Sequence, residues 1–470
     1  MADSEKERAI FDRARLHELT LAELDAFRDA RPRSAELYRT AQSTLIGGVP
    51  MNWMNKWATA SPIAGDPHAF PIFAERAEGA WLIDVDGHEY ADFCLGDTGA
   101  MTGHSPPPVA EILKESSGDG FTYMLPTAAA VDASRQLATR FGMAQWQFTV
   151  SATDANRFAI RLARELTGRR KVLVFNYCYH GTVDESFARR GDGGRVIPRP
   201  YNLGAPVPLA ETTRVVEFND LDTLEQELSH GDVACVLTEP ALTNVGIVLP
   251  QPGFHEGLRK LTRENGTLLI IDETHTISAG PGGYTAVNNL EPDLLTIGKA
   301  IASGIPAGAY GISAALAAKI EADSDLKHTL TEGMGTGGTL AGNALTARVI
   351  AVTLSEVLTP EAFDRMKSLA ASWAAGVQGV IDAHQLPWQV TLLGARGEYA
   401  FTSEVPRNGT ELAAAGDELL ERYLRIKLIN NGIITTPFHN MALMSPATSK
   451  DDVDRHTEVL DEAVTTLRAT

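Results

Sequence analysis

Two short apolar runs, TLLIID at residues 267–272 and DLLTI at residues 293–297, give the clearest indication of the fold. Polar residues stand at the end of each run: Asp272 is the last residue of the first, and Gly298-Lys299 follows the second. Similar runs lie at 147–150, 171–175, 214–218, 233–239 and 308–313. Strands that are apolar throughout and joined by helices are typical of a mostly parallel sheet buried on both faces. We therefore predict an α/β fold with a mostly parallel seven-stranded sheet flanked by helices.

The segments around these runs predict how the chain is divided. Residues 5–35 carry two short, polar helical patterns that Pro32 is expected to end, and a hairpin is expected around Asp86-Gly87. Glycine density peaks at 333–338, before a long helical segment. We predict an N-terminal arm and the start of a small domain at 1–80, a large domain at 81–335, and a smaller α+β domain at 336–470.

Composition excludes several classes of protein. The 470 residues are 44% hydrophobic, which is enough for a large core, and 41 Lys+Arg against 60 Asp+Glu give a net charge of −19. Such a charge repels nucleic acid and anionic membranes, so neither is an expected partner. The three cysteines form no C-x-x-C pair, no metal-ligand spacing is evident, and the first residues lack an apolar signal segment. We expect a cytoplasmic protein without a metal site.

Ligands of open α/β sheets bind at the carboxyl ends of the strands, so polar residues there are candidate site residues. Asp272 and Lys299 are two, and Ser151-Ala152-Thr153 at a helix start and Tyr179-His180-Gly181 follow other strands. A lysine held near a carbonyl forms a Schiff base, a buried carboxylate holds a protonated pyridine nitrogen, and a helix N-terminus binds phosphate. Taken singly, these residues also fit a surface lysine, a salt bridge, an N-cap by Thr153 and simple packing.

Together the motifs resemble a known enzyme family. The order SATDA (151–155), YHG (179–181), TEP (238–240), IIDETHT (270–276), TIGKAIASGIPAGAYG (296–311) and GTLAGN (338–343) is similar to the class III aminotransferases of the fold-type-I pyridoxal-phosphate enzymes. Within them the chain looks closest to the branch that contains glutamate-1-semialdehyde aminomutase and relatives acting on D- or β-amino acids. The resemblance runs from about residue 40 to the end.

The resemblance implies a homodimer with pyridoxal 5′-phosphate near the subunit interface. Lys299 would form the Schiff base and Asp272 would hold the ring nitrogen protonated. Tyr179 and Thr274 would cover the two ring faces, with Glu239 near the ring hydroxyl. The remaining cofactor residues would be those of the phosphate helix, the residue after Tyr179, and a threonine from the other subunit: Ser151, Ala152, Thr153, His180 and Thr339. Lys299, Asp272 and Tyr179 are the predicted catalytic residues.

The predicted activity is an aminotransferase that takes an amino group from an amine donor and passes it to a keto acid or aldehyde in a ping-pong cycle. The aminomutase branch has an arginine where this chain has Met54, and Trp53, Met54 and Trp57 would instead form an apolar wall for a bulky or aromatic amine, or simply pack in the core. Arg396 would clamp a substrate carboxylate, or form a salt bridge. The alternative is an aminomutase or isomerase of the same family.

An NAD-dependent oxidoreductase is the alternative from a different class. Residues 333–338 satisfy the G-x-G-x-x-G spacing. The preceding segment, EADSDLKHTLTE, is polar and unlike a buried strand, and the motif lies late in the chain. Both observations count against a dinucleotide fold.

Overall fold

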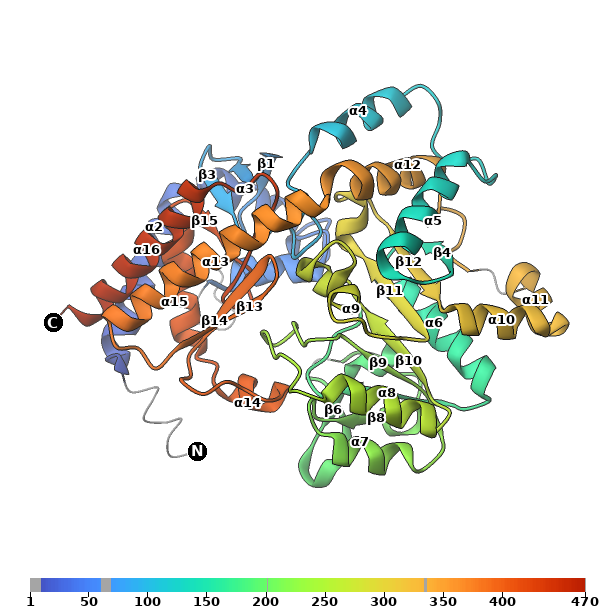
Figure 1. The fold of residues 1–470 in the computed structure, drawn as a ribbon. Coiled ribbons are helices and arrows are strands. Elements are labelled where there is room, and N and C mark those ends of the chain that lie inside the picture. The colour runs from blue at the N-terminus through green and yellow to red at the C-terminus, as the bar shows by residue number, and fades with distance from the viewer. Residues whose placement is uncertain (1–9, 61–68, 201, 334–335, 470) are drawn as a thin grey trace.

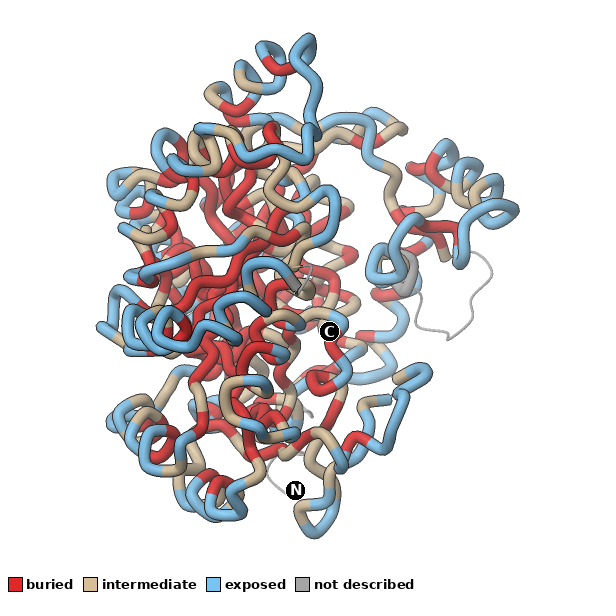
Figure 2. The backbone as a smooth tube through the Cα atoms, turned by 90° about the vertical axis from the view of Figure 1, so that its right-hand side faces the viewer, coloured by how far each residue is buried: buried red, intermediate tan, exposed pale blue. Residues whose placement is uncertain are grey.

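The computed structural model describes residues 10–60, 69–200, 202–333 and 336–469. Two lobes are visible in Figure 1, one built around a large sheet and the other formed by the first and last parts of the chain. Buried backbone is concentrated in the middle of the molecule, with exposed helices and loops outside it (Figure 2). Among the described residues, no helix is both long and apolar enough to cross a membrane.

The large sheet has the strand order β4-β12-β11-β10-β9-β5-β8. Strands β8, β5, β9, β10 and β11 run parallel, whereas β12 is antiparallel to both β11 and β4. The strands are β4 (Gln145–Thr149), β5 (Lys171–Phe175), β8 (Thr213–Val216), β9 (Val233–Thr238), β10 (Leu268–Asp272), β11 (Leu294–Gly298) and β12 (Gly308–Ile312). Each predicted apolar run is one of these strands, and the predicted α/β fold is confirmed.

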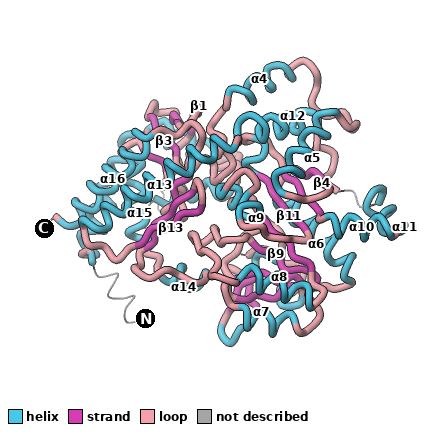
Figure 3. The backbone as a smooth tube through the Cα atoms, viewed as in Figure 1, coloured by secondary structure: helices cyan, strands magenta, loops and turns pink. Residues whose placement is uncertain are grey.

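Helices cover both faces of this sheet (Figure 3) because alternate strand residues point to opposite sides. Val172 and Val174 pack in one core with α6 (Ala152–Thr167), while Leu173 and Phe175 pack in another with α7 (Leu221–Leu228) and α8 (Phe254–Glu264). The other helices of this part of the chain are α4 (Pro107–Ser116), α5 (Ala128–Phe141), α9 (Gly283–Val287), α10 (Ala314–Ala322), α11 (Ser324–His328) and α12 (Ala344–Val352).

The second lobe joins the two ends of the chain. Strands β1 (Ala74–Glu78), β2 (Trp81–Asp84) and β3 (Glu89–Asp92) form a sheet with β15 (Ile433–Ile434), and Gly87 turns the expected hairpin with φ 91°. Strands β13 (Gln389–Leu393), β14 (Arg396–Ala400) and β16 (Met441–Leu443) form another sheet. Its helices are α13 (Pro360–Ala383), α14 (Gly409–Ala414), α15 (Glu418–Asn430) and α16 (Lys450–Arg468). The division at residues 80 and 335 stays a prediction.

The N-terminal arm differs from the sequence-based expectation. Helix α2 (Arg13–Ala30) spans the second pattern and the end of the first, whose beginning falls in residues 1–9, outside the described part. The expected end of the helical pattern at Pro32 is confirmed, since α2 stops at Ala30. Pro32 also begins α3 (Pro32–Ala41), because a proline at the first helical position loses no hydrogen bond. Short elements follow at η2 (Ile46–Gly48) and η3 (Asn52–Ala60).

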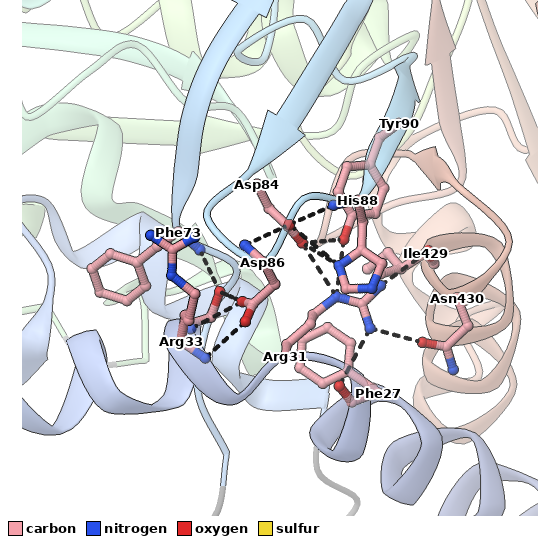
Figure 4. Close-up of polar contacts among 11 residues, drawn as sticks. Phe27, Arg31, Arg33, Phe73, Asp84, Asp86, His88, Tyr90, Ile429 and Asn430 are labelled. Carbon is pink, nitrogen blue, oxygen red and sulfur yellow. Dashed lines mark hydrogen bonds and ion pairs between the residues drawn. The ribbon is translucent and has the colours of Figure 1, made fainter.

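Arg31, between α2 and α3, ties the arm to the rest of the lobe (Figure 4). Its guanidinium donates hydrogen bonds to the Tyr90 hydroxyl at 2.9 Å, to Asn430 Oδ1 at 3.2 Å, and to two backbone oxygens. It also lies 3.6 Å from a carboxylate oxygen of Asp84, which is fully buried. A buried arginine with this many partners is compensated for the loss of water, so it fixes α2 against both β2 and α15.

Candidate active site

The carboxyl ends of β9, β10 and β11 meet at a small cavity of about 280 Å³. Asp272, Lys299, Tyr179, Glu239 and Thr274 line it together with the start of α6. The structure therefore brings together eight predicted cofactor residues from separate parts of the chain: Ser151, Ala152, Thr153, Tyr179, Glu239, Asp272, Thr274 and Lys299.

Asp272 is held as a carboxylate. Its Oδ2 accepts hydrogen bonds from Asn156 Nδ2 at 2.8 Å and from His180 Nδ1 at 3.0 Å, and its Oδ1 accepts from the Thr274 backbone N–H at 3.0 Å. Burial alone would raise its pKa, but these donors, His180 foremost, lower the pKa of Asp272 to about 2. A negative charge at this position attracts a protonated ring nitrogen. His180 thus acts behind Asp272 rather than on the cavity wall.

The start of α6 supplies a phosphate-sized group of donors. Ser151 is the N-cap, since its Oγ accepts from the Asp154 backbone N–H at 3.2 Å, so the expectation that Thr153 caps the helix is wrong. The first-turn N–H groups of Ala152 and Thr153 have no partner inside the helix. A Cβ on Gly298 would lie 2.9 Å from the Ala152 nitrogen, so glycine before Lys299 keeps that donor uncovered.

Lys299 begins a short 3-10 helix directly after β11, with φ 49°. Its Nζ donates to Asp97 Oδ2 at 2.8 Å and lies 2.7 Å from His275 Nε2. The sequence-based prediction missed both Asp97 and His275 as partners of Lys299. The signal for His275 was its place three residues after Asp272, but no local pattern marks Asp97, which is 202 positions from Lys299.

The loop that carries Asp97 has an unusual backbone. Leu95, Asp97 and Thr98 have φ values of 46°, 52° and 78°. Left-handed backbone costs a residue with a side chain roughly 1–2 kcal/mol, and it clusters where the surrounding structure requires it. Here it turns Asp97 toward Lys299 and Thr98 toward His275, with Thr98 Oγ1 2.9 Å from His275 Nδ1.

A second cavity of about 1570 Å³ shares Tyr179, His275 and Lys299 with the small one. Trp53, Met54 and Trp57 of η3 line it, and their role as a substrate wall stays a prediction. The Trp53 ring meets the Tyr179 ring edge-on at 5.8 Å between centroids and lies 5.6 Å from the Phe438 ring. A substrate entering here would reach Lys299 along an aromatic side.

Arg396 lies behind Asp97 on β14. Its side chain is 1% exposed, and NH2 is 3.8 Å from Asp97 Oδ1. None of its three guanidinium nitrogens has a hydrogen-bond partner among the described residues. An unsatisfied buried guanidinium is costly, but Arg396 lines neither cavity, so its contact with a substrate carboxylate stays a prediction.

The small cavity also fits a ring with polar substituents. Glu239 Oε1 and Thr274 Oγ1 are buried without hydrogen-bond partners among the described residues, and burial raises the pKa of Glu239 to about 7.

Thr339 is exposed and does not line either cavity of its own chain. Residues 334–335 of the glycine-rich 333–338 segment lie outside the described residues, and a π-helical turn (Thr329–Gly333), not a strand, precedes them.

The family model of class III aminotransferases matches residues 63–464. The chain belongs to the class III aminotransferase family. A class III enzyme of this kind uses pyridoxal 5′-phosphate, and the residues around the small cavity fit that cofactor. The predicted family and the predicted cofactor are both confirmed.

Similar class III proteins include several aminomutases. The solved structure of a glutamate-1-semialdehyde aminomutase from Pseudomonas aeruginosa PAO1 is 47% identical, with a TM-score of 0.92 over 97% of this chain and 99% of that one. A variant of the same protein was solved in complex with PMP. Glutamate-1-semialdehyde 2,1-aminomutase 2 of an Exiguobacterium species is 33% identical over 90% of this chain and 94% of its own. An omega-transaminase from Sphaerobacter thermophilus is 27% identical, with a TM-score of 0.82 over 93% of this chain and 98% of its own.

These likenesses correct the predicted activity. Relatives that are 30–47% identical over most of the chain are named aminomutases, so the predicted aminotransferase activity is wrong and its alternative is favoured. The prediction relied on Met54 standing in place of an arginine. That position lies on an exposed 3-10 helix, and a cation from another element can meet a substrate carboxylate equally well.

Proposed function

We propose that this protein is a pyridoxal-phosphate-dependent aminomutase that moves an amino group between neighbouring carbons of one small substrate. The observation that carries the proposal is the 47% identity to a glutamate-1-semialdehyde aminomutase over 97% of the chain. The contacts around Lys299 and Asp272 support it, because both groups that the chemistry needs reach the same small cavity.

The family resemblance suggests a role for each residue around the small cavity. Lys299 joins the cofactor, and Asp272 holds its ring nitrogen in the protonated form. Ala152 and Thr153 bind its phosphate through the α6 N-terminus, where Ser151 is the cap. Tyr179 and Thr274 pack on its two faces, and His180 keeps Asp272 ionised.

When bound, the cofactor supplies a carbonyl that takes up amines and an electron-accepting ring. The chain does the rest. Asp272 keeps the ring positively charged, which stabilises negative charge that develops on the reacting carbon. Lys299, once free, holds the proton that must be moved between carbons. Glu239, with a pKa near 7, donates or accepts a hydrogen bond at the ring hydroxyl.

We assign the substrate carboxylate to Arg396. The buried guanidinium without hydrogen-bond partners gains them when an anion binds. Trp53, Met54 and Trp57 line the large cavity and would form an apolar wall for the substrate. We further propose that the active form is a homodimer in which Thr339 of one chain reaches the phosphate bound by the other, since Thr339 is exposed in its own chain.

The test uses the purified protein with glutamate-1-semialdehyde labelled with ¹⁵N and with no added keto acid. We expect the isomeric amino ketone, with the label kept and no second substrate required. The Lys299→Ala variant should show no conversion. Conversion that depends on an added keto acid, with the label transferred to that acid, would refute the aminomutase.

A further inference from the structure

His275 faces the amine of Lys299, and no role has yet been given to it. The two nitrogens, Lys299 Nζ and His275 Nε2, are 2.7 Å apart. We propose that His275 is the acid–base partner of Lys299: it accepts the proton that Lys299 must lose before its amine can react, and it returns that proton afterwards. The inference rests on the proposed role of Lys299 and is independent of the substrate.

The hydrogen bonds define which nitrogen of His275 is free to accept. A lysine ammonium only donates, so Nε2 must present its lone pair to Lys299. The single proton of the neutral imidazole is therefore on Nδ1, where it donates to Thr98 Oγ1 at 2.9 Å. The hydroxyl of Thr98 thus holds the ring in the orientation and tautomer that proton acceptance requires.

The surroundings of His275 keep its imidazole neutral at rest, so that it is able to accept a proton. Burial, and then the positive charge of Lys299, keep the pKa of His275 well below its usual value, so the resting imidazole is neutral. Arg396 acts in the same direction, while Asp97 and Asp272 oppose it. When the proton moves, the repulsion from Lys299 disappears. The Asp97 carboxylate, 3.9 Å from His275 Nε2, then faces the imidazolium.

The transfer conserves charge and atoms. The N–H bond at Lys299 Nζ breaks and an N–H bond at His275 Nε2 forms, which converts ammonium plus imidazole into amine plus imidazolium. Before the transfer, the charges beside Asp97, Lys299 foremost, outweigh burial and hold its pKa far below the usual range. After the transfer the imidazolium of His275 lies beside it, so Asp97 stays a carboxylate. No other reactant is needed.

The first experiment measures covalent capture of pyridoxal 5′-phosphate by the full-length, cofactor-free protein, followed by absorbance in a stopped-flow instrument from pH 6 to pH 10. Capture requires the free amine of Lys299. In His275→Gln, which accepts a hydrogen bond but not a proton, we expect capture at pH 7 to be about 100-fold slower or more, since acid–base groups typically contribute 10²–10⁴-fold. The rate should recover at high pH. Capture by His275→Gln at the parent rate and with the parent pH profile would overturn the proposal.

His384→Gln is the matched control. His384 Nε2 also contacts a carboxylate, Asp461 Oδ1 at 2.7 Å, but it caps the end of α13 and lines neither cavity. It should capture the cofactor normally. Lys299→Ala separates the two proposals, because normal covalent capture by that variant would refute the proposed site itself, whatever His275 does.

Chemical rescue distinguishes proton transfer from simple support. In His275→Ala, added imidazole should accelerate capture severalfold, and more basic imidazoles should do so more strongly. A slow variant that no imidazole accelerates would show a merely structural role and overturn the proposal.

If His275→Ala does not fold, Thr98→Val serves as the second variant, since it keeps the volume and removes the hydrogen-bond partner of His275 Nδ1. Capture by Thr98→Val should be slower at pH 7, and an unchanged rate would count against the relay.

Discussion

Two buried arginines allow a sharp test of the substrate assignment, because replacing each by methionine should have opposite effects on stability. Arg31 is surrounded by acceptors, including Tyr90 and Asp84, whereas Arg396 has no hydrogen-bond partner among the described residues. Methionine preserves much of the side-chain length and removes the charge in both cases. The two sites differ in whether hydrogen bonds and ion pairs compensate the arginine for its loss of water.

The magnitudes follow from that balance. Arg31→Met leaves the buried Asp84 carboxylate without its cation, a loss that costs about 3–5 kcal/mol of unfolding free energy. Arg396→Met removes unsatisfied donors, and Asp97 keeps Lys299 at 2.8 Å, so stability should stay constant or rise by up to about 2 kcal/mol. A charged hydrogen bond to substrate contributes about 1.5–3 kcal/mol, which corresponds to a roughly 10- to 150-fold higher KM in Arg396→Met.

The assay combines urea unfolding with steady-state kinetics on glutamate-1-semialdehyde, and the exposed Arg33→Met serves as the control for the substitution itself. Arg33→Met should match the parent in both measurements. Equal destabilisation by Arg396→Met and Arg31→Met, together with an unchanged KM in Arg396→Met, would show that Arg396 is a structural group and not a carboxylate clamp.

Three further outcomes are expected. Asp272→Asn keeps the side-chain volume but removes the charge, so turnover should fall by about 10²–10³-fold while the cofactor stays bound. Steady-state rates and cofactor absorbance measure the two effects. Turnover at the parent rate would contradict the role of Asp272. Because burial raises the pKa of Glu239 from 4.5 to about 7, the folded cofactor-free protein holds this proton more tightly than the unfolded chain. The proton on Glu239 therefore stabilises the folded state by about 3 kcal/mol below pH 4.5, and this stabilisation disappears as the pH rises through 7. In urea titrations at pH 5 and pH 8, Glu239→Gln should lose less stability between the two pH values than the parent does. An equally large loss in the variant would disprove the assignment. In Gly181→Ala the new Cβ would lie 2.0 Å from Thr153 Oγ1, so the dissociation constant of pyridoxal 5′-phosphate should rise about tenfold or more by equilibrium dialysis. Gly142→Ala, which has a similar φ and open space around it, should bind normally, and equal affinities in the two variants would argue against the α6 contact.

The sequence predicted the sheet because its signal is local. Each strand is a short apolar run, and both Asp272 and Lys299 stand where a run ends, so their meeting at one edge follows from parallel topology. The partners of Lys299 could not be found this way. Asp97 is brought to Lys299 by a left-handed loop after a distant hairpin, and nothing in its neighbours predicts that geometry.

The helix after Pro32 and the activity were missed for different reasons. Pro32 was correctly expected to end a helix, but the same proline also begins α3, which was not predicted from the sequence. The activity depended on one position, Met54, where a missing cation was taken to mean a different reaction. A charge that binds substrate can move between elements during divergence, so a single position says little about the chemistry.

The pairing of β3 with β15, with Ala91 opposite Ile433, sets the order in which a newly made chain can fold. The hydrogen bond from Arg31 likewise requires Asn430, which lies 399 residues further along the chain. Until residues 430–434 have left the ribosome, the apolar side of α2 and the edge of the first hairpin lack their packing partners. The large sheet, whose strands come from the middle of the chain, can assemble earlier, so the beginning of this protein is among the last parts to become native and is the part that a chaperone would have most reason to shield.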